Sequence, residues 1–210
     1  MKTLRSLGGT PFGHDVLVAL LKGYQRPNDK ISDLLAKGAV LKLRRGLYVL
    51  GPDEHDKPLC LPLLANHILG PSYVSLEYAL GWHGLIPEGV VDVTSVTLKR
   101  SRTMTTPVGR FSYAHLPQKA YAIGIRMEQT LDGGSFLLAS AEKALCDLVM
   151  LTRGLPSMTV DTMSTWLLAH MRLDMEAIAA MDISIVRDCA GAGYKSRHLE
   201  VLTKTLESLR

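Results

Sequence analysis

Residues 39–50, with the sequence AVLKLRRGLYVL, place two short apolar runs on either side of two arginines and a glycine. The first run alternates apolar residues with Lys42, and Gly46 can adopt the backbone torsions that a tight turn requires. This pattern predicts a β-hairpin. Arg44 and Arg45 are expected at its protruding tip, where a negatively charged partner can reach them.

Two short helices are predicted between the N-terminus and the hairpin. Residues 15–21 (DVLVALL) carry a helical apolar stripe that Gly23 ends. Residues 26–38 contain a Pro-Asn pair that favours a helix start, three aliphatic residues on one face and a terminal glycine. The order helix, helix, hairpin within residues 1–52 predicts a winged helix-turn-helix domain.

This N-terminal segment is strongly basic, with nine lysines and arginines against three acids in the first 52 residues. We expect it to bind DNA, because phosphate contacts need cations and the second helix can face the major groove. Asp29 and Asp33 lie on or near that helix face and oppose close phosphate contact. A charged surface hairpin with no DNA partner is the alternative. The predicted DNA-contacting residues are Arg26, Asn28, Lys30, Ser32, Lys37, Lys42, Arg44 and Arg45.

A domain boundary is predicted directly after the hairpin. Residues 51–58 (GPDEHDKP) combine glycine, two prolines and several charges, a composition typical of linkers. The chain of 210 residues is long for one small domain and comfortable for two. We therefore expect a DNA-binding domain at residues 1–52 and a second domain at residues 59–210.

The second domain is predicted to be α+β. A buried helix is expected at 59–69 and another from Ser75 as its N-cap, followed by several antiparallel strands and then helices from Ser140 onwards. Among the strands, 102–116 is expected to form one, and Asp132-Gly133 indicates a hairpin turn. The predicted fold class is an N-terminal winged helix-turn-helix followed by an α+β domain with antiparallel strands and a helical C-terminal half.

A second basic segment lies inside this domain. Residues 93–127 hold six lysines and arginines and no acid. Such segregation indicates a polyanionic partner, although an ordinary solvated face is the alternative. The residues expected to form this second basic surface are Lys99, Arg100, Arg102 and Arg110.

No catalytic residue, metal site or cofactor is predicted. Ser140 and Lys143 match the S-x-x-K pattern of serine acyl enzymes, but the accompanying motifs are missing and a helix N-cap explains the serine better. The seven histidines are scattered, and the three cysteines are widely spaced in apolar surroundings. The chemistry expected from this sequence is therefore binding, not catalysis.

A cytoplasmic location without a membrane partner is expected. No apolar run approaches the roughly 20 residues that a membrane-spanning helix needs. The segment MKTLRSLGGTPFGHD also lacks the apolar core of a signal peptide.

Three segments together resemble the AbiEi family of antitoxins from type IV toxin-antitoxin systems. They are KISDLLAKGAVLKLRRGLY (30–48), YVSLEYALGWHGLIPE (73–88) and ASAEKALCDLV (139–149). The resemblance covers the chain from about residue 13 to about residue 150, and its segments occur in the family's order.

This resemblance implies a transcriptional regulator without enzymatic activity. Its N-terminal winged helix-turn-helix is expected to repress its own operon by binding inverted repeats in promoter DNA. Its second domain is expected to counteract a cognate nucleotidyltransferase-like toxin. Two alternatives are a protein-interaction module that binds no DNA and an enzyme that acts on nucleic acid.

Overall fold

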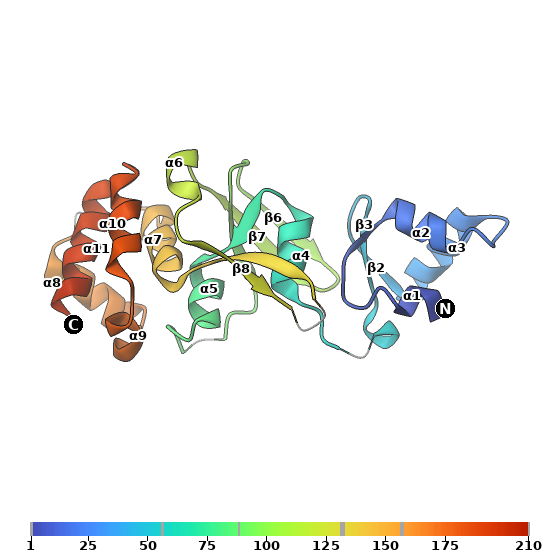
Figure 1. The fold of residues 1–210 in the computed structure, drawn as a ribbon, viewed down its shortest axis with the longest axis horizontal. Helices are drawn as coiled ribbons and strands as arrows, with labels where there is room; N and C mark the ends of the chain where they lie inside the picture. Colours follow the sequence, from blue (N-terminus) through green and yellow to red (C-terminus); the bar gives the residue numbers. More distant parts are fainter. Residues whose placement is uncertain (1, 56, 88, 131–132, 156–157, 210) are drawn as a thin grey trace.

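The computed structural model describes residues 2–55, 57–87, 89–130, 133–155 and 158–209. Figure 1 shows three regions along the long axis of the molecule: an N-terminal unit, a central β-sheet with its helices, and a C-terminal group of helices. Helices and strands are mixed along the chain, which confirms the predicted α+β class.

The two helices and the hairpin expected in the N-terminal unit are present. Helix α2 covers seven residues, and helix α3 covers ten. Pro27 lies in the first turn of α3, where its missing N–H costs no hydrogen bond, and Ile31 and Leu34 are buried. The bounds are α1 Lys2–Arg5, β1 Phe12–Gly13, α2 His14–Leu20, α3 Pro27–Ala36, β2 Val40–Arg44 and β3 Leu47–Leu50.

The hairpin turn differs from the three-residue tip that the sequence suggests. Strand β2 continues through Arg44, which pairs with Leu47, so that Arg45 and Gly46 alone form the turn. Gly46 has a φ of 76°, a left-handed torsion that glycine adopts without strain. Arg45 therefore lies at the tip, whereas Arg44 ends a strand.

Apolar side chains on both faces of the β2–β3 hairpin are buried. The inner face, with Val40 and Leu50, packs into the small hydrophobic core of the N-terminal unit. The outer face, with Leu43, Leu47 and Val49, belongs to the large hydrophobic core that also contains the central sheet. All four residues of β3 are buried as a result. This packing fixes the N-terminal unit to the rest of the molecule.

The predicted linker begins with a short 3-10 turn, η1 (Pro52–Glu54). The Gly51 N–H donates to the Ala39 carbonyl oxygen at 2.9 Å, and the Arg5 guanidinium lies 3.1 Å from the Glu54 carboxylate. The start of the linker is therefore held against the N-terminal unit. The boundary between residues 1–52 and 59–210 stays a prediction.

The central sheet has six strands in the order β6-β7-β5-β4-β9-β8. The predicted antiparallel arrangement is only partly right, because β5 pairs with β7 and β4 pairs with β9 in parallel. The segment 102–116 forms two strands joined by a turn, not one. The bounds are β4 Ser72–Val74, β5 Val93–Thr97, β6 Arg102–Thr106, β7 Gly109–His115, β8 Ile125–Gln129 and β9 Ser135–Ala139.

The sequence did not predict strand β4 but did predict the hairpin of β8 and β9. Strand β4 is only three residues long and lies between two helices, so the sequence carries no alternating pattern that could reveal it. Strands β8 and β9 form the hairpin that the sequence predicts. Of the predicted turn signal, Asp132 lies outside the described residues.

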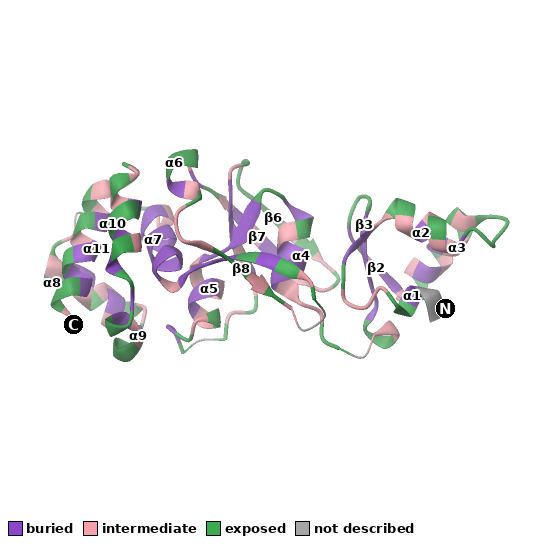
Figure 2. Cartoon of the chain, viewed as in Figure 1, coloured by how far each residue is buried: buried purple, intermediate pink, exposed green. Residues whose placement is uncertain are grey.

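Helices cover the two faces of the sheet. The Tyr113 hydroxyl on β7 donates to the Ala65 carbonyl oxygen of α4 (Leu61–Ile68) at 2.8 Å. The Tyr73 hydroxyl on β4 donates to Asp147 on α7 (Ala141–Leu151) at 2.8 Å. The strand register places these two tyrosines on opposite faces, so α4 and α7 lie on opposite sides. Figure 2 shows buried residues concentrated in the inner strands of the sheet, α4 and α7, whereas the end strands β6 and β8 have no buried residue.

The C-terminal half is helical, as predicted. Ser140 is the N-cap of α7, because its hydroxyl accepts the Lys143 N–H at 3.2 Å. Ser75 occupies the N-cap position of α5 but its hydroxyl donates to Asp147 instead. The bounds are α5 Leu76–Trp82, α6 Gln118–Tyr121, α7 Ala141–Leu151, α8 Val160–Thr165, the π-helical turn η2 Trp166–His170, α9 Met175–Ala179, α10 Ile183–Gly191 and α11 Ser196–Ser208.

The double burial of the hairpin predicts a large effect of Leu43→Ala. Leu43 is 4% exposed in the shared core, so truncation should lower the free energy of unfolding by about 2–5 kcal/mol. Its neighbour Lys42 is exposed, and Lys42→Ala should change the free energy of unfolding by less than about 0.5 kcal/mol. Chemical denaturation of both variants measures the difference. Equal effects of the two substitutions would contradict burial of the outer face.

Candidate nucleic-acid interface

The hairpin presents two cations that are free to bind a partner. Lys42 and Arg45 are exposed, and neither forms an ion pair with another described residue. Arg44 is also exposed, but its guanidinium donates to the His67 carbonyl oxygen of α4 at 3.4 Å and to the Arg45 carbonyl oxygen at 3.2 Å. Arg44 thus lies across the junction between the hairpin and α4.

Helix α3 carries its cations in ion pairs. Lys30 and Lys37 both lie 2.9 Å from the Asp33 carboxylate, and Arg26 lies 3.7 Å from Asp29. Hydrogen bonds from Lys37 and Lys30 lower the pKa of Asp33 below its usual value. The two acids therefore offset much of the positive charge that the sequence assigns to this helix.

The polar residues predicted to face base edges on α3 are exposed. Asn28 and Ser32 are both exposed, and the Ser32 hydroxyl donates to the Asn28 carbonyl oxygen at 3.1 Å. The Asn28 side chain remains available for a partner. The sequence interpretation overlooked Tyr24, whose ring is half exposed with the Lys30 ammonium 5.6 Å from its centroid. In the sequence, the feature that could have revealed Tyr24 is its position as an aromatic residue between Lys22 and Arg26.

Three of the four residues in the predicted second basic surface are free of ion pairs with described residues. Lys99 and Arg100 lie in the loop after β5, Arg102 begins β6, and all three are exposed. Arg110 differs, because its guanidinium lies 3.4 Å from the Asp92 carboxylate.

The structure brings the two basic segments together. Strand β2 lies against β6. Arg44 is close enough to Tyr113 that its charge opposes the rise in the tyrosine pKa that burial causes. Tyr113 is the register partner of Arg102, and paired residues of an antiparallel ladder share a face. The set Lys42, Arg44, Arg45, Lys99, Arg100 and Arg102, whose members lie on β2 and β6 or in the turn and loop next to them, is called the basic surface.

The S-x-x-K segment forms a buried structural cluster. The Lys143 ammonium lies 2.8 Å from the Asp147 carboxylate and donates to the Ala120 carbonyl oxygen at 2.5 Å, and both side chains are fully buried. Asp147 also accepts the hydroxyls of Tyr73 and Ser75. Burial raises the pKa of Asp147, while Lys143 and the two hydroxyls oppose that rise. Asp147 thus has an opposite charge and two hydroxyl donors beside it inside the core, where an unpaired charge is costly.

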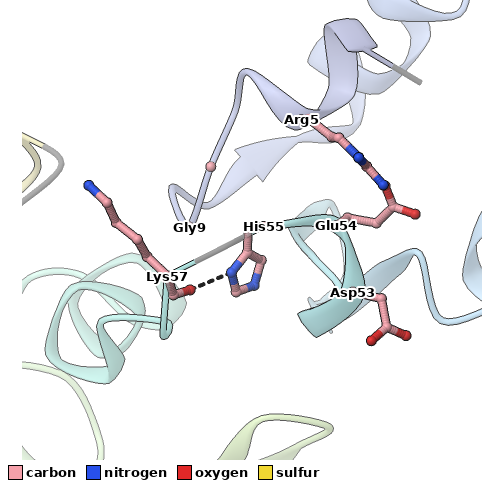
Figure 3. A pocket seen from close by; sticks show the side chains of 7 residues that line it. Arg5, Gly9, Asp53, Glu54, His55 and Lys57 are labelled. Carbon is pink, nitrogen blue, oxygen red and sulfur yellow. Dashed lines mark hydrogen bonds and ion pairs between the residues drawn. The ribbon is translucent and has the colours of Figure 1, made fainter.

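A charged cavity of about 240 Å³ lies between the segment after α1 and the predicted linker. Figure 3 shows Arg5 reaching Glu54 across it, with the His55 ring donating from Nδ1 to the Lys57 carbonyl oxygen. The Asp53 side chain, which belongs to the same turn, points away from Arg5 and Glu54. Within the described ranges, no group of three or more His, Cys, Asp or Glu residues is arranged to hold a metal ion.

Comparison of the chain with models of protein families and with curated proteins finds no match. None of the helices in the described part of the chain combines the length and the apolar character needed to cross a membrane.

The ion pairs on α3 predict that removing Asp33 strengthens DNA binding. Asp33→Asn releases Lys30 and Lys37 and removes one negative charge from the helix face, which raises the net charge by one. We expect severalfold tighter binding of random duplex DNA at low salt. The slope of log K against log salt should steepen by up to about 0.9 for each additional phosphate that the helix neutralises.

Asp161 on α8 provides the matched control, because it is exposed and its replacement by Asn makes the same change in net charge. Fluorescence anisotropy across a salt series measures both variants. Equal binding by Asp33→Asn, Asp161→Asn and the unmodified protein would show that α3 does not face the duplex.

Proposed function

We propose that this protein is a DNA-binding antitoxin and autorepressor of a type IV toxin-antitoxin operon. In this proposal residues 1–52 form a winged helix-turn-helix, with α3 in the major groove and the β2–β3 hairpin as the wing. The observation that carries the proposal is the basic surface, in which cations from both units lie on neighbouring strands. Exposed cations without partners are the groups that DNA phosphates neutralise.

The basic surface suits a duplex better than the hairpin alone. A wing with one free arginine at its tip holds few phosphates, and α3 is partly neutralised by Asp29 and Asp33. Lys99, Arg100 and Arg102 extend the positive charge onto the central sheet. The second domain therefore contributes to DNA binding in this proposal, while Asn28 and Ser32 distinguish promoter DNA from other sequences.

The antitoxin role rests on the resemblance in segments 30–48, 73–88 and 139–149. The second and third of these segments meet at the buried Asp147, which accepts hydroxyls from Tyr73 and Ser75. In this proposal residues 59–210 counter a cognate nucleotidyltransferase-like toxin in the cytoplasm, and the protein performs no catalysis itself. Promoter DNA with inverted repeats and the toxin are the two partners.

The basic surface is tested by two double variants. Lys42→Ala/Arg45→Ala removes the free cations of the hairpin, and Lys99→Ala/Arg102→Ala removes two from the sheet. Each should flatten the slope of log K against log salt by up to about 1.8, at about 0.9 for each phosphate that is no longer neutralised. Binding to promoter and scrambled fragments should weaken alike, because phosphate contacts carry no sequence information.

Two exposed cations of α11 provide the control. Arg197→Ala/Lys204→Ala makes the same charge change at the far end of the molecule and should leave the slope unchanged. Similar slopes for all three double variants would contradict DNA binding by the basic surface. A protein that binds no DNA at any salt concentration, yet suppresses the toxin, would instead be a protein-interaction module.

A further inference from the structure

Strand β8 forms one end of the central sheet and, among the strands of the described part of the chain, pairs only with β9. Its ladder runs without a register shift from Ile125 to Gln129. The strand contains no proline and no bulge, which are two common devices that keep an edge strand from pairing with another chain. Strand β6, at the other end of the sheet, lies against β2. The edge of β8 is thus available for a further strand.

The hydrogen bonds next to β8 show which of its backbone groups face outwards. The Ser140 N–H donates to the Gly124 carbonyl oxygen at 2.8 Å, and the Thr130 N–H donates to the Gly134 carbonyl oxygen at 2.7 Å. Residues 124 and 130 therefore bond towards β9. Because bonding alternates along an antiparallel strand, Ile125, Met127 and Gln129 direct their N–H and C=O groups away from the sheet.

The side chains around this edge include two exposed apolar residues. Met127 is 67% exposed and Leu137, its register partner on β9, is 40% exposed. They lie on one face of the sheet, whereas Arg126 and Glu128 lie on the other. Neither Arg126 nor Glu128 forms an ion pair with another described residue.

We propose that β8 pairs antiparallel with β8 of a second copy of this chain, about a twofold axis at Met127. The sequence of the strand, IRMEQ, complements itself in this register. Arg126 of each copy then lies opposite Glu128 of the other, and Ile125 lies opposite Gln129. Met127 lies opposite its own counterpart.

The backbone geometry fits the same axis. The outward-facing groups of Ile125, Met127 and Gln129 meet their counterparts as hydrogen-bonded pairs. Arg126 and Glu128 form the pairs without mutual backbone bonds, in which opposite side chains approach most closely. On the other face, Met127 and Leu137 of both copies gather into one apolar cluster. One continuous sheet then runs through both subunits.

The pairing needs no DNA, so its test is separate from that of the proposed function.

Charge reversal tests this pairing on the full-length protein. Arg126→Glu places two acids opposite each other at both ends of the contact, and Glu128→Arg places two bases there. Sedimentation over a concentration series should show a reversible dimer for the unmodified protein and at least tenfold weaker association for each variant. An equimolar mixture of the two variants should recover the dimer, because every pair is then of opposite charge.

Two further variants separate this contact from other causes. Met127→Pro removes an outward N–H and leaves the bonds to β9 in place, so it should abolish the dimer while thermal unfolding stays cooperative. Lys119→Glu on α6 reverses an exposed charge nearby and should leave association unchanged. A monomeric unmodified protein, a dimer that persists in Met127→Pro, or a mixture that fails to recover the dimer would each overturn the proposal.

Discussion

The structure depends on the burial of the β2–β3 hairpin on both of its faces. The inner face closes the small core under α2 and α3, and the outer face packs into the large core of the central sheet. Val49 and Leu50, which are neighbours in β3, have no exposed surface although they belong to different cores. Because apolar burial is the main source of folding stability, one four-residue strand holds two structural units in a fixed relation.

This fixed relation determines the electrostatics of the molecule. The hairpin cations and the cations of the loop before β6 are more than fifty residues apart in sequence, yet β2 lies against β6. On α3, by contrast, Asp29 and Asp33 pair with the lysines and arginine around them. Among the basic residues that the sequence assigns to DNA, those without an ion pair to a described residue therefore lie at the junction between the two units. The cations of the helix that the sequence favours as the DNA-contacting element are paired.

Local patterns predicted the local structure well. The Pro-Asn start of α3, the hairpin and the N-cap Ser140 are present because propensity, capping and turn chemistry act over a few residues. The docking of the hairpin was missed, although a continuous apolar run such as LYVL is typical of a strand buried on both faces. Parallel pairing of β4 and the partners of Asp147 join distant segments, and no local pattern reveals such contacts.

The proposed DNA-binding function requires that the hairpin and the central sheet present one continuous surface to DNA. This is tested by attaching an iron-based DNA-cleaving reagent to a cysteine introduced at position 45 or 102, as Arg45→Cys or Arg102→Cys. The partly buried Cys60 is replaced by Ser, so that the remaining native cysteines, Cys146 and Cys189, are both buried. We expect cleavage from both positions within about one helical turn, roughly 10 base pairs, of the same duplex site. Cleavage from position 45 with none from position 102, or cleavage at widely separated sites, would contradict it.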